Sequence, residues 1–299
     1  MPEVEGVSFL KRIFKIMLVV LVVVEIIFVM SKGSDSENKQ VKGDHSVDLA
    51  YVLWDTEIAS TNVVKTVFED LGYNVTMTQL DVAIMFEAIS NGEADGMVAA
   101  WLPATHGSYY EEYKERFEDL GPNITGARIG LVVPDYMSVN DIDQLKDQAD
   151  KTIVGIEPGA GIMQATERAL ESYPNLNDWT LESSSTGAMT SLLKQAYQKE
   201  EEIVITGWSP HWIFQAYDLK YLEDPKGEFG GEETINTLVR LGLKEDDPIA
   251  YQVLDRFNWT LADMESVMLE ISEGATPEVA ARNWVDNNQE RVSQWIEGL

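Results

Sequence analysis

Residues 95–106 read DGMVAAWLPATH, a run of small and apolar residues that ends in tryptophan, proline and histidine. Residues 202–212, EIVITGWSPHW, repeat the same phrase further along the chain. Short apolar runs bounded by turn residues are typical of buried strands. Trp101 and Trp208 therefore stand at the carboxyl ends of two predicted strands, in equivalent places of two similar units.

Strand and helix patterns alternate ahead of each phrase. Before the first phrase, strands are predicted at VDLAYVLW (47–54) and YNVTMTQL (73–80), and helices at ASTNVVKTVFEDLG (59–72) and DVAIMFEAISNG (81–92). Before the second, strands are predicted at KTIVGI (151–156) and WTLESSS (179–185), and helices at 159–174 and 186–201. The first helix is expected to have Ser60 or Thr61 near its N-cap. Each unit is a βαβαβ arrangement, which predicts an α/β fold with parallel strands.

The chain is expected to cross between the two units twice. The apolar run 127–137 predicts a strand, and the stretch 221–242, which contains Pro and several Gly, predicts irregular chain. Two crossings between two units predict a hinge. The C-terminal region is predicted to be helical, with a last helix that starts at Thr276 and places Trp284 and Trp295 on one buried face.

The charge balance restricts the classes of partner. The chain has 51 acidic and 22 basic residues and a formal net charge of −29, which argues against nucleic-acid binding. It has no Cys and three His, so thiol nucleophiles and zinc–thiolate sites are excluded, and no metal or cofactor is expected. Asp55, Glu57 and Asp81 could form carboxylate pairs, but an acidic chain offers many such pairs by chance. No catalytic constellation is identified, and an enzyme is not expected.

The N-terminal residues form a separate segment. A basic flank precedes an apolar run, 16–30, that is broken only by Glu25. Such a segment is typical of a signal anchor or a cleaved signal peptide at 1–32, followed by a flexible linker at 33–46. Because no small-residue cleavage site follows the run, we expect one uncleaved helix in the cell membrane, with the rest of the chain outside. Cleavage would make the protein secreted.

Three tryptophans are expected at one edge of the sheet. Ligands of parallel α/β sheets bind outside the carboxyl ends of the strands. Trp54, Trp101 and Trp208 all follow predicted strands at that edge. A quaternary ammonium group has no N–H to donate, and aromatic faces, Trp above all, attract it through the ring quadrupole. The alternative is that these rings only fill the core.

The segment PGAGI, residues 158–162, leads into a predicted helix. The free backbone N–H groups of a helix N-terminus attract anions, and a carboxylate is the expected guest here. His106 could donate a further hydrogen bond to it. The alternatives are a simple tight turn and a histidine that caps a loop.

Several motifs taken together resemble those of a known family, the substrate-binding proteins of glycine betaine ABC importers. They are YVLWDTEIASTNVV (51–64), DGMVAAWLPATH, GIEPGAGIM (155–163), SSTGAMT (184–190), ITGWSPHW (205–212) and FNWTLADMESVM (257–268). The resemblance runs from about Val47 to Leu299. It implies a bilobal type II periplasmic-binding-protein fold, preceded here by the hydrophobic helix, that closes on its ligand. Lobe 1 would comprise 47–131 and 236–299, and lobe 2 would comprise 132–235.

The resemblance also implies roles for individual residues. The aromatic cage would be Trp54, Trp101 and Trp208, and the ligand carboxylate would meet the backbone N–H groups of Gly161 and Ile162 and the side chain of His106. His211 and Trp212 would be wall residues or lie just behind the cage.

The function implied is that of a receptor for glycine betaine or a related quaternary ammonium osmolyte. The receptor would deliver its ligand to an ABC permease and its ATPase subunits, for osmoprotection, and would do no covalent chemistry. One rival is an enzyme acting on a small trimethylammonium acid, which would need a positioned base. Another is a ligand-sensing ectodomain, which would need a cytoplasmic output module; the stretch ahead of the apolar run is too short for one.

Overall fold

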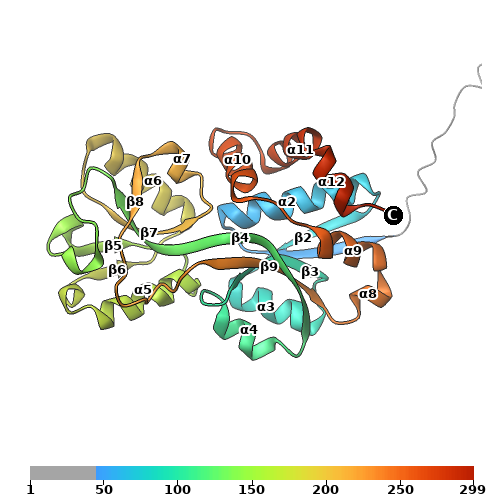
Figure 1. The fold of residues 1–299 in the computed structure, drawn as a ribbon, viewed down its shortest axis with the longest axis horizontal. Helices are drawn as coiled ribbons and strands as arrows, with labels where there is room; N and C mark the ends of the chain where they lie inside the picture. Colours follow the sequence, from blue (N-terminus) through green and yellow to red (C-terminus); the bar gives the residue numbers. More distant parts are fainter. Residues whose placement is uncertain (1–44) are drawn as a thin grey trace, which may run out of the picture. The chain divides into compact units, whose positions relative to one another are not determined.

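The computed structural model describes residues 45–299, so the predicted membrane helix and most of the linker lie outside the described residues. Among the described residues, no helix has both the length and the apolar character needed to cross a bilayer. A curled sheet of nine strands organises this part of the chain, in the order β2-β1-β3-β9-β4-β7-β5-β6, with β8 paired to β4 (Figure 1).

The first group of parallel strands is built from the N-terminal βαβαβ unit. Strands β1, β2 and β3 pair in parallel, and helices α2, α3 and α4 connect or follow them. The bounds are β1 Ser46–Tyr51, α2 Asp55–Asp70, β2 Asn74–Gln79, α3 Val82–Asn91, β3 Gly96–Leu102 and α4 Gly107–Tyr113. Every residue of β3 is buried, as expected for an apolar strand covered on both faces. Helix α3 ends at Gly92, whose φ of 71° lies in the left-handed region that glycine tolerates.

The second group repeats this arrangement. Strands β5, β6 and β7 pair in parallel, and helices α5 and α6 connect them. The bounds are β5 Thr152–Val154, α5 Gly161–Ser172, β6 Thr180–Glu182, α6 Thr186–Lys199 and β7 Val204–Ser209, followed by the short α7 Ile213–Ala216 and β8 Leu219–Tyr221. Short 3-10 turns lie at Ile142–Gln144 and Pro174–Leu176, and the turn at Gln148–Lys151 contains left-handed φ angles at Ala149 and Asp150.

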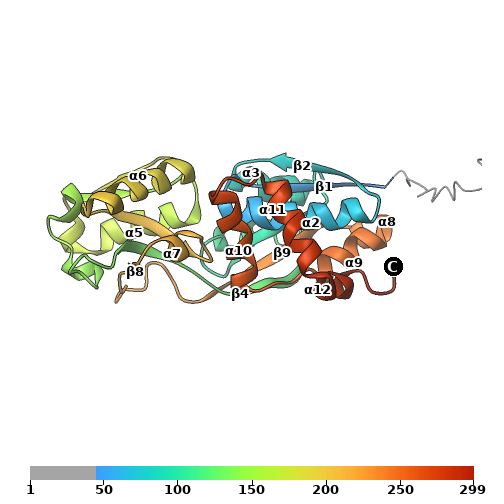
Figure 2. The ribbon, with the colours of Figure 1, turned by 90° about the horizontal axis from the view of Figure 1, so that it is seen from above.

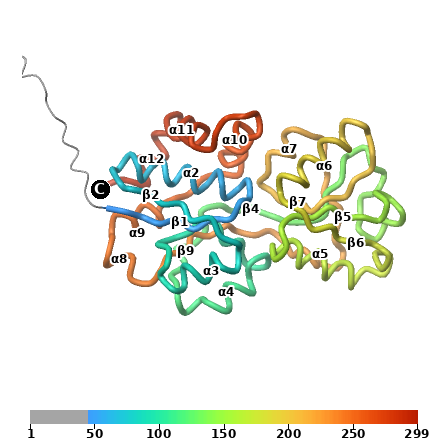
Figure 3. The backbone as a smooth tube through the Cα atoms, turned by 180° about the vertical axis from the view of Figure 1, so that it is seen from behind, coloured from blue at the N-terminus to red at the C-terminus, as the bar shows by residue number. Residues whose placement is uncertain are grey.

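Two long strands join the groups. β4, Phe117–Pro134, runs antiparallel to β9 along its first part and antiparallel to β7 along its last part. β9, Glu233–Arg240, lies between β3 and β4 and is antiparallel to both. The path of these strands is visible from the front and from behind (Figures 1 and 3). The chain therefore crosses between the two groups at β4 and again just before β9.

The C-terminal helices pack beside the first group. Helices α10 and α11 both contact α2, and α9 contacts β4 and β9 (Figure 2). Their bounds are α8 Leu243–Asp246, α9 Pro248–Arg256, α10 Leu261–Ser272, α11 Pro277–Asn287 and α12 Gln289–Trp295. Thr276 caps α11 with Pro277 at its first position, as predicted. Trp284 and Trp295 are buried and stacked 5.9 Å apart, which confirms their place in the core.

Three details of the predicted elements were wrong. Helix α2 starts at Asp55, ahead of the Ser60 and Thr61 expected near its cap, because acidic residues in the first turn suit the positive helix end. The chain expected to be irregular contains strand β9, whose β-branched residues pair with both neighbours. The last predicted helix is interrupted at Asn288, which separates α11 from α12.

Candidate functional site

A pocket with about 310 Å³ of empty space, part of it open to solvent, lies where the carboxyl ends of the two parallel groups approach each other. It is lined by residues of both groups and of β4: Trp54, Thr56, Trp101, Thr105, His106, Ile129, Ile156, Ala160, Gly161, Ile162 and Trp208. All six residues singled out in the sequence are in this set. The structure thus brings them together, and their contact with a ligand stays a prediction.

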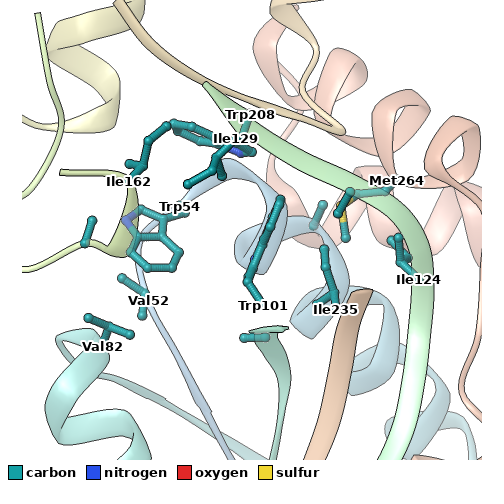
Figure 4. Packing of buried hydrophobic residues seen from close by; sticks show 14 of the residues in the cluster. Val52, Trp54, Val82, Trp101, Ile124, Ile129, Ile162, Trp208, Ile235 and Met264 are labelled. Atoms are coloured by element: carbon teal, nitrogen blue, oxygen red, sulfur yellow. The ribbon is translucent and has the colours of Figure 1, made fainter. Parts of the chain in front are cut away.

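Three indole rings supply most of the aromatic wall. Trp54 precedes the first residue of α2, Trp101 lies near the end of β3 and Trp208 near the end of β7. Figure 4 shows the rings around one space, with Ile129 and Ile162 at its edge. Each of these three residues is at most 7% exposed. Aromatic faces turned to an apolar cavity are suited to an organic cation that cannot donate a hydrogen bond.

His106 provides a buried hydrogen-bond donor at this wall. Its Nδ1 accepts the backbone N–H of Trp101 at 3.1 Å, so in the neutral ring the proton sits on Nε2. Burial lowers the pKa of His106 to about 3, which keeps the ring neutral at physiological pH. Nε2 is buried and has no hydrogen-bond partner among the described residues. The side chain therefore offers one N–H to a cavity that its ring lines.

The N-terminus of α5 provides further donors. Gly161 is the first residue of this helix, and no side chain caps it. The first N–H groups of a helix have no intrahelical acceptor and carry the positive end of its dipole. Gly161 and Ile162 both line the cavity. An anion bound there would meet backbone N–H groups on one side and the His106 ring on another.

Gly161 also marks a close contact between the two groups. A Cβ at this position would lie 2.1 Å from the carbonyl oxygen of Thr105 and 2.6 Å from its methyl carbon. Only glycine allows α5 to approach the loop after β3 so closely. Glu233 fixes that loop, because its Oε1 accepts the N–H groups of Ala104 and Thr105, both at 2.7 Å.

A second buried carboxyl lies behind the cavity wall. Glu57, in the first turn of α2, is 1% exposed and accepts the indole N–H of Trp101 at 3.1 Å. Its other oxygen accepts the hydroxyl of Thr56, a cavity residue. Burial, with a smaller contribution from the nearby charge of Asp55, outweighs these two hydrogen bonds and raises the pKa of Glu57 to about 7.

Asp55 links the first group to the second. Its Oδ2 accepts the indole N–H of Trp212 at 2.6 Å and lies 3.5 Å from Nε2 of His211. His211 packs edge-on against Trp208 at 4.6 Å, and burial lowers its pKa to about 3. His211 and Trp212 are not among the residues that line the cavity; they lie behind the cage, which is the second of the two positions implied by the resemblance.

Sequence reasoning missed several of these residues as members of the site. Thr105 lies inside the quoted phrase between Trp101 and His106, so its position could have suggested it. Ile129 is an ordinary apolar residue of β4, and no sequence signal distinguishes it. Glu57 was noted only as one acid among many, and its burial follows from the packing of α2.

Residues 45–287 match the model of a protein family described as the substrate binding domain of ABC-type glycine betaine transport systems. The chain belongs to this family. A curated relative, the glycine betaine/carnitine transport binding protein GbuC of Listeria monocytogenes, is 49% identical over 177 residues. That match spans 58% of this chain and 58% of the relative.

Solved structures of the family resemble the whole described part. Lactococcal OpuAC, in a closed conformation with glycine betaine, is 54% identical with a TM-score of 0.83, over 85% of this chain and 100% of that one. The glycine/betaine/L-proline-binding protein ProX of Borrelia burgdorferi is 38% identical with a TM-score of 0.81, over 85% of this chain and 97% of that one. The mixed α/β substrate-binding fold predicted from the sequence is confirmed by these similarities.

Proposed function

We propose that this protein is an extracytoplasmic receptor that binds glycine betaine, or a closely related quaternary ammonium osmolyte, and delivers it to an ABC importer. The observation that carries the proposal is the cavity itself, where three indole rings, one neutral imidazole N–H and an uncapped helix N-terminus meet. Family membership and the similarity to GbuC and lactococcal OpuAC support the same ligand class.

The cage would hold the trimethylammonium group. Trp54, Trp101 and Trp208 present aromatic faces, each of which contributes up to about 2 kcal/mol to binding of a desolvated cation. A ligand with N–H groups in place of methyl groups would lose their hydration and find aromatic carbon instead of acceptors. Glycine should therefore bind much more weakly than glycine betaine.

The other end of the cavity would hold the carboxylate. The backbone N–H groups of Gly161 and Ile162 and the Nε2–H of His106 are its proposed donors. Hydrogen bonds to a charged group contribute about 1.5–3 kcal/mol each when desolvated. Choline has no carboxylate, and it should bind more weakly than glycine betaine for that reason.

The two strand groups would act as two lobes, 47–131 with 236–299 and 132–235, that close on the ligand. Support comes from the two crossings, since these boundaries fall in β4 and β9. The tight packing of Gly161 on Thr105 and the bond from Trp212 to Asp55 join the groups and suit a closed state. Closure would remove the ligand from water and present one shape to the permease.

An N-terminal helix, within 1–32, would hold the receptor at the outer face of the cell membrane, tethered by 33–46. Its basic flank and apolar run support this proposal. The permease and its ATPase subunits are the proposed partners.

An enzyme acting on a trimethylammonium acid is the weaker candidate. Among residues 45–299, the two buried imidazoles are neutral, and the buried Glu57 faces Trp101 rather than the cavity.

Isothermal titration of the purified protein with glycine betaine, and with glycine at the same concentrations, tests the function. Saturable binding of glycine betaine, with glycine at least a hundredfold weaker, is the expected result. Equal binding of the two ligands, or release of a chemically altered product, would refute the receptor proposal.

A further inference from the structure

The three cage tryptophans differ in what their indole N–H groups contact. Nε1 of Trp54 and Nε1 of Trp208 are buried without a hydrogen-bond partner among the described residues. Nε1 of Trp101 donates to Oε1 of Glu57 at 3.1 Å. One wall of the cage is therefore backed by a carboxyl group that is itself 1% exposed and held by a second bond from Thr56.

Given the receptor function proposed above, we propose that Glu57 is a positioning and specificity-determining residue. Its carboxylate fixes the Trp101 ring and supplies a buried negative charge that favours a cationic ligand in the cage. Glu57 does not line the cavity, so it acts on the ligand through Trp101 and through its field.

The positioning effect follows from the geometry. A carboxylate on Nε1–H fixes the rotation of the indole, so the ring face that meets the ligand is ordered before binding and less conformational entropy is lost. A charged acceptor makes a stronger bond than a neutral one. It also adds electron density to the ring, which increases the attraction of its face for a cation.

The charge effect follows from burial. The cage is lined by buried apolar side chains, so a buried charge interacts with a buried cation far more strongly than in water. A quaternary ammonium cannot lose its charge by giving up a proton. Its binding therefore favours the ionised form of Glu57, and ionised Glu57 favours its binding, by the same factor.

A pH profile separates this role from a purely structural one. Burial raises the pKa of Glu57 to about 7, so the carboxyl takes up a proton within the range where the protein can be assayed. The other titratable side chains around the cavity are His106, His211, Asp55, Glu157 and Glu233. The two histidines have pKa values of about 3 and do not change charge above pH 5. Of the three acids, Asp55 also has a pKa raised by its burial, so only the part of the pH dependence that Glu57→Gln removes is assigned to Glu57.

The test measures the Kd of glycine betaine from pH 5.5 to 8.5 in the wild-type protein and in Glu57→Gln. Gln keeps an amide oxygen for the Trp101 N–H and removes the charge. In the wild type, affinity is expected to fall as pH decreases below about 7 and to approach that of Glu57→Gln, a total loss of about tenfold. In Glu57→Gln, the Kd is expected to be about tenfold weaker at pH 8.5 and nearly independent of pH.

Two controls make the result specific. Glu118→Gln alters another carboxyl that accepts an aromatic side chain, the Tyr251 hydroxyl at 2.5 Å, and should keep the wild-type affinity and profile. The second control is 3,3-dimethylbutyrate, a carboxylate of the same shape with carbon in place of nitrogen. Glu57→Gln should weaken its binding much less than that of glycine betaine.

The possible results test the role of Glu57 and the proposed receptor function separately. If the wild type binds glycine betaine at pH 8.5 with a Kd that does not change down to pH 5.5, or if Glu57→Gln binds as well as the wild type at pH 8.5, the role of Glu57 is refuted. If the variant does not fold, a wild-type Kd that stays constant from pH 8.5 to pH 5.5 still refutes the role of Glu57, because that measurement needs no substitution. If the wild type does not bind glycine betaine at any pH, the proposed function fails instead.

Discussion

Substitution of Gly161 by alanine tests whether ligand binding requires the close approach of the two strand groups. The added Cβ would lie 2.1 Å from the Thr105 carbonyl oxygen, whereas ordinary van der Waals contacts of a Cβ begin at 3.4 Å. The two groups would have to separate by more than an ångström, and overpacking of this kind costs about 1–3 kcal/mol. That corresponds to a Kd about 5- to 150-fold weaker.

The substitution is predicted to destabilise only the closed, ligand-bound state of the protein. Alanine retains the backbone N–H, and the φ of Gly161 is not in the left-handed region, so neither a lost donor nor backbone strain accounts for weaker binding. In a ligand-free protein that opens, the Tm should stay within about 2 °C of wild type. Gly187→Ala is the matched control, since this glycine also lies at a helix N-terminus, in α6, and a Cβ there meets nothing within 4 Å.

Isothermal titration and a thermal melt measure both quantities. Gly161→Ala with the affinity of Gly187→Ala would refute the close approach as a requirement for binding. An equal loss of affinity in both variants, or a large fall in Tm of Gly161→Ala without ligand, would show that the defect lies in folding rather than in closure.

The remaining predictions concern single contacts, each checked by titration with glycine betaine. Trp208→Ala should weaken binding about 30-fold, the equivalent of one cation–π face, and Trp208→Phe should weaken it less. The control Trp284→Phe changes a tryptophan of the core pair and should leave the Kd unchanged. An equal effect of Trp284→Phe and Trp208→Phe would contradict the cage. His106→Ala should weaken the binding of glycine betaine at least tenfold and change the binding of choline little, because only the carboxylate accepts a hydrogen bond from Nε2–H. Equal losses of affinity for both ligands would contradict that role. Trp212→Phe removes the hydrogen-bond donor to Asp55 and should raise the dissociation rate of the ligand about tenfold. Stopped-flow fluorescence measures this rate, and an unchanged rate would show that the bond does not hold the closed state.

The alternation of strands and helices was predictable because most elements carry strong local signals. β3 and β7 are apolar runs that end in the same phrase, and α3 ends at a glycine with the expected left-handed φ. Their order required parallel strands, and parallel strands place Trp101 and Trp208 at one edge. The cavity residues near those strand ends could therefore be identified before the structure was known.

Other features depend on packing between distant segments. β9 follows several glycines and a proline, and only its pairing with β3 and β4 defines it as a strand. Glu57 is an ordinary acidic residue of a helix first turn, and it becomes distinctive only because Trp101 and Thr56 converge on it. The necessity of glycine at 161 similarly depends on Thr105, which lies in a different segment of the chain.

The most direct test of the central claim is a calorimetric titration of the purified protein with glycine betaine at pH 8.5, repeated with Trp101→Ala. Saturable binding of one ligand per chain, weakened at least 30-fold in the variant, is the result predicted by an aromatic cage with Trp101 as one wall. Absence of binding by a folded wild-type protein, or equal binding by the variant, would contradict it.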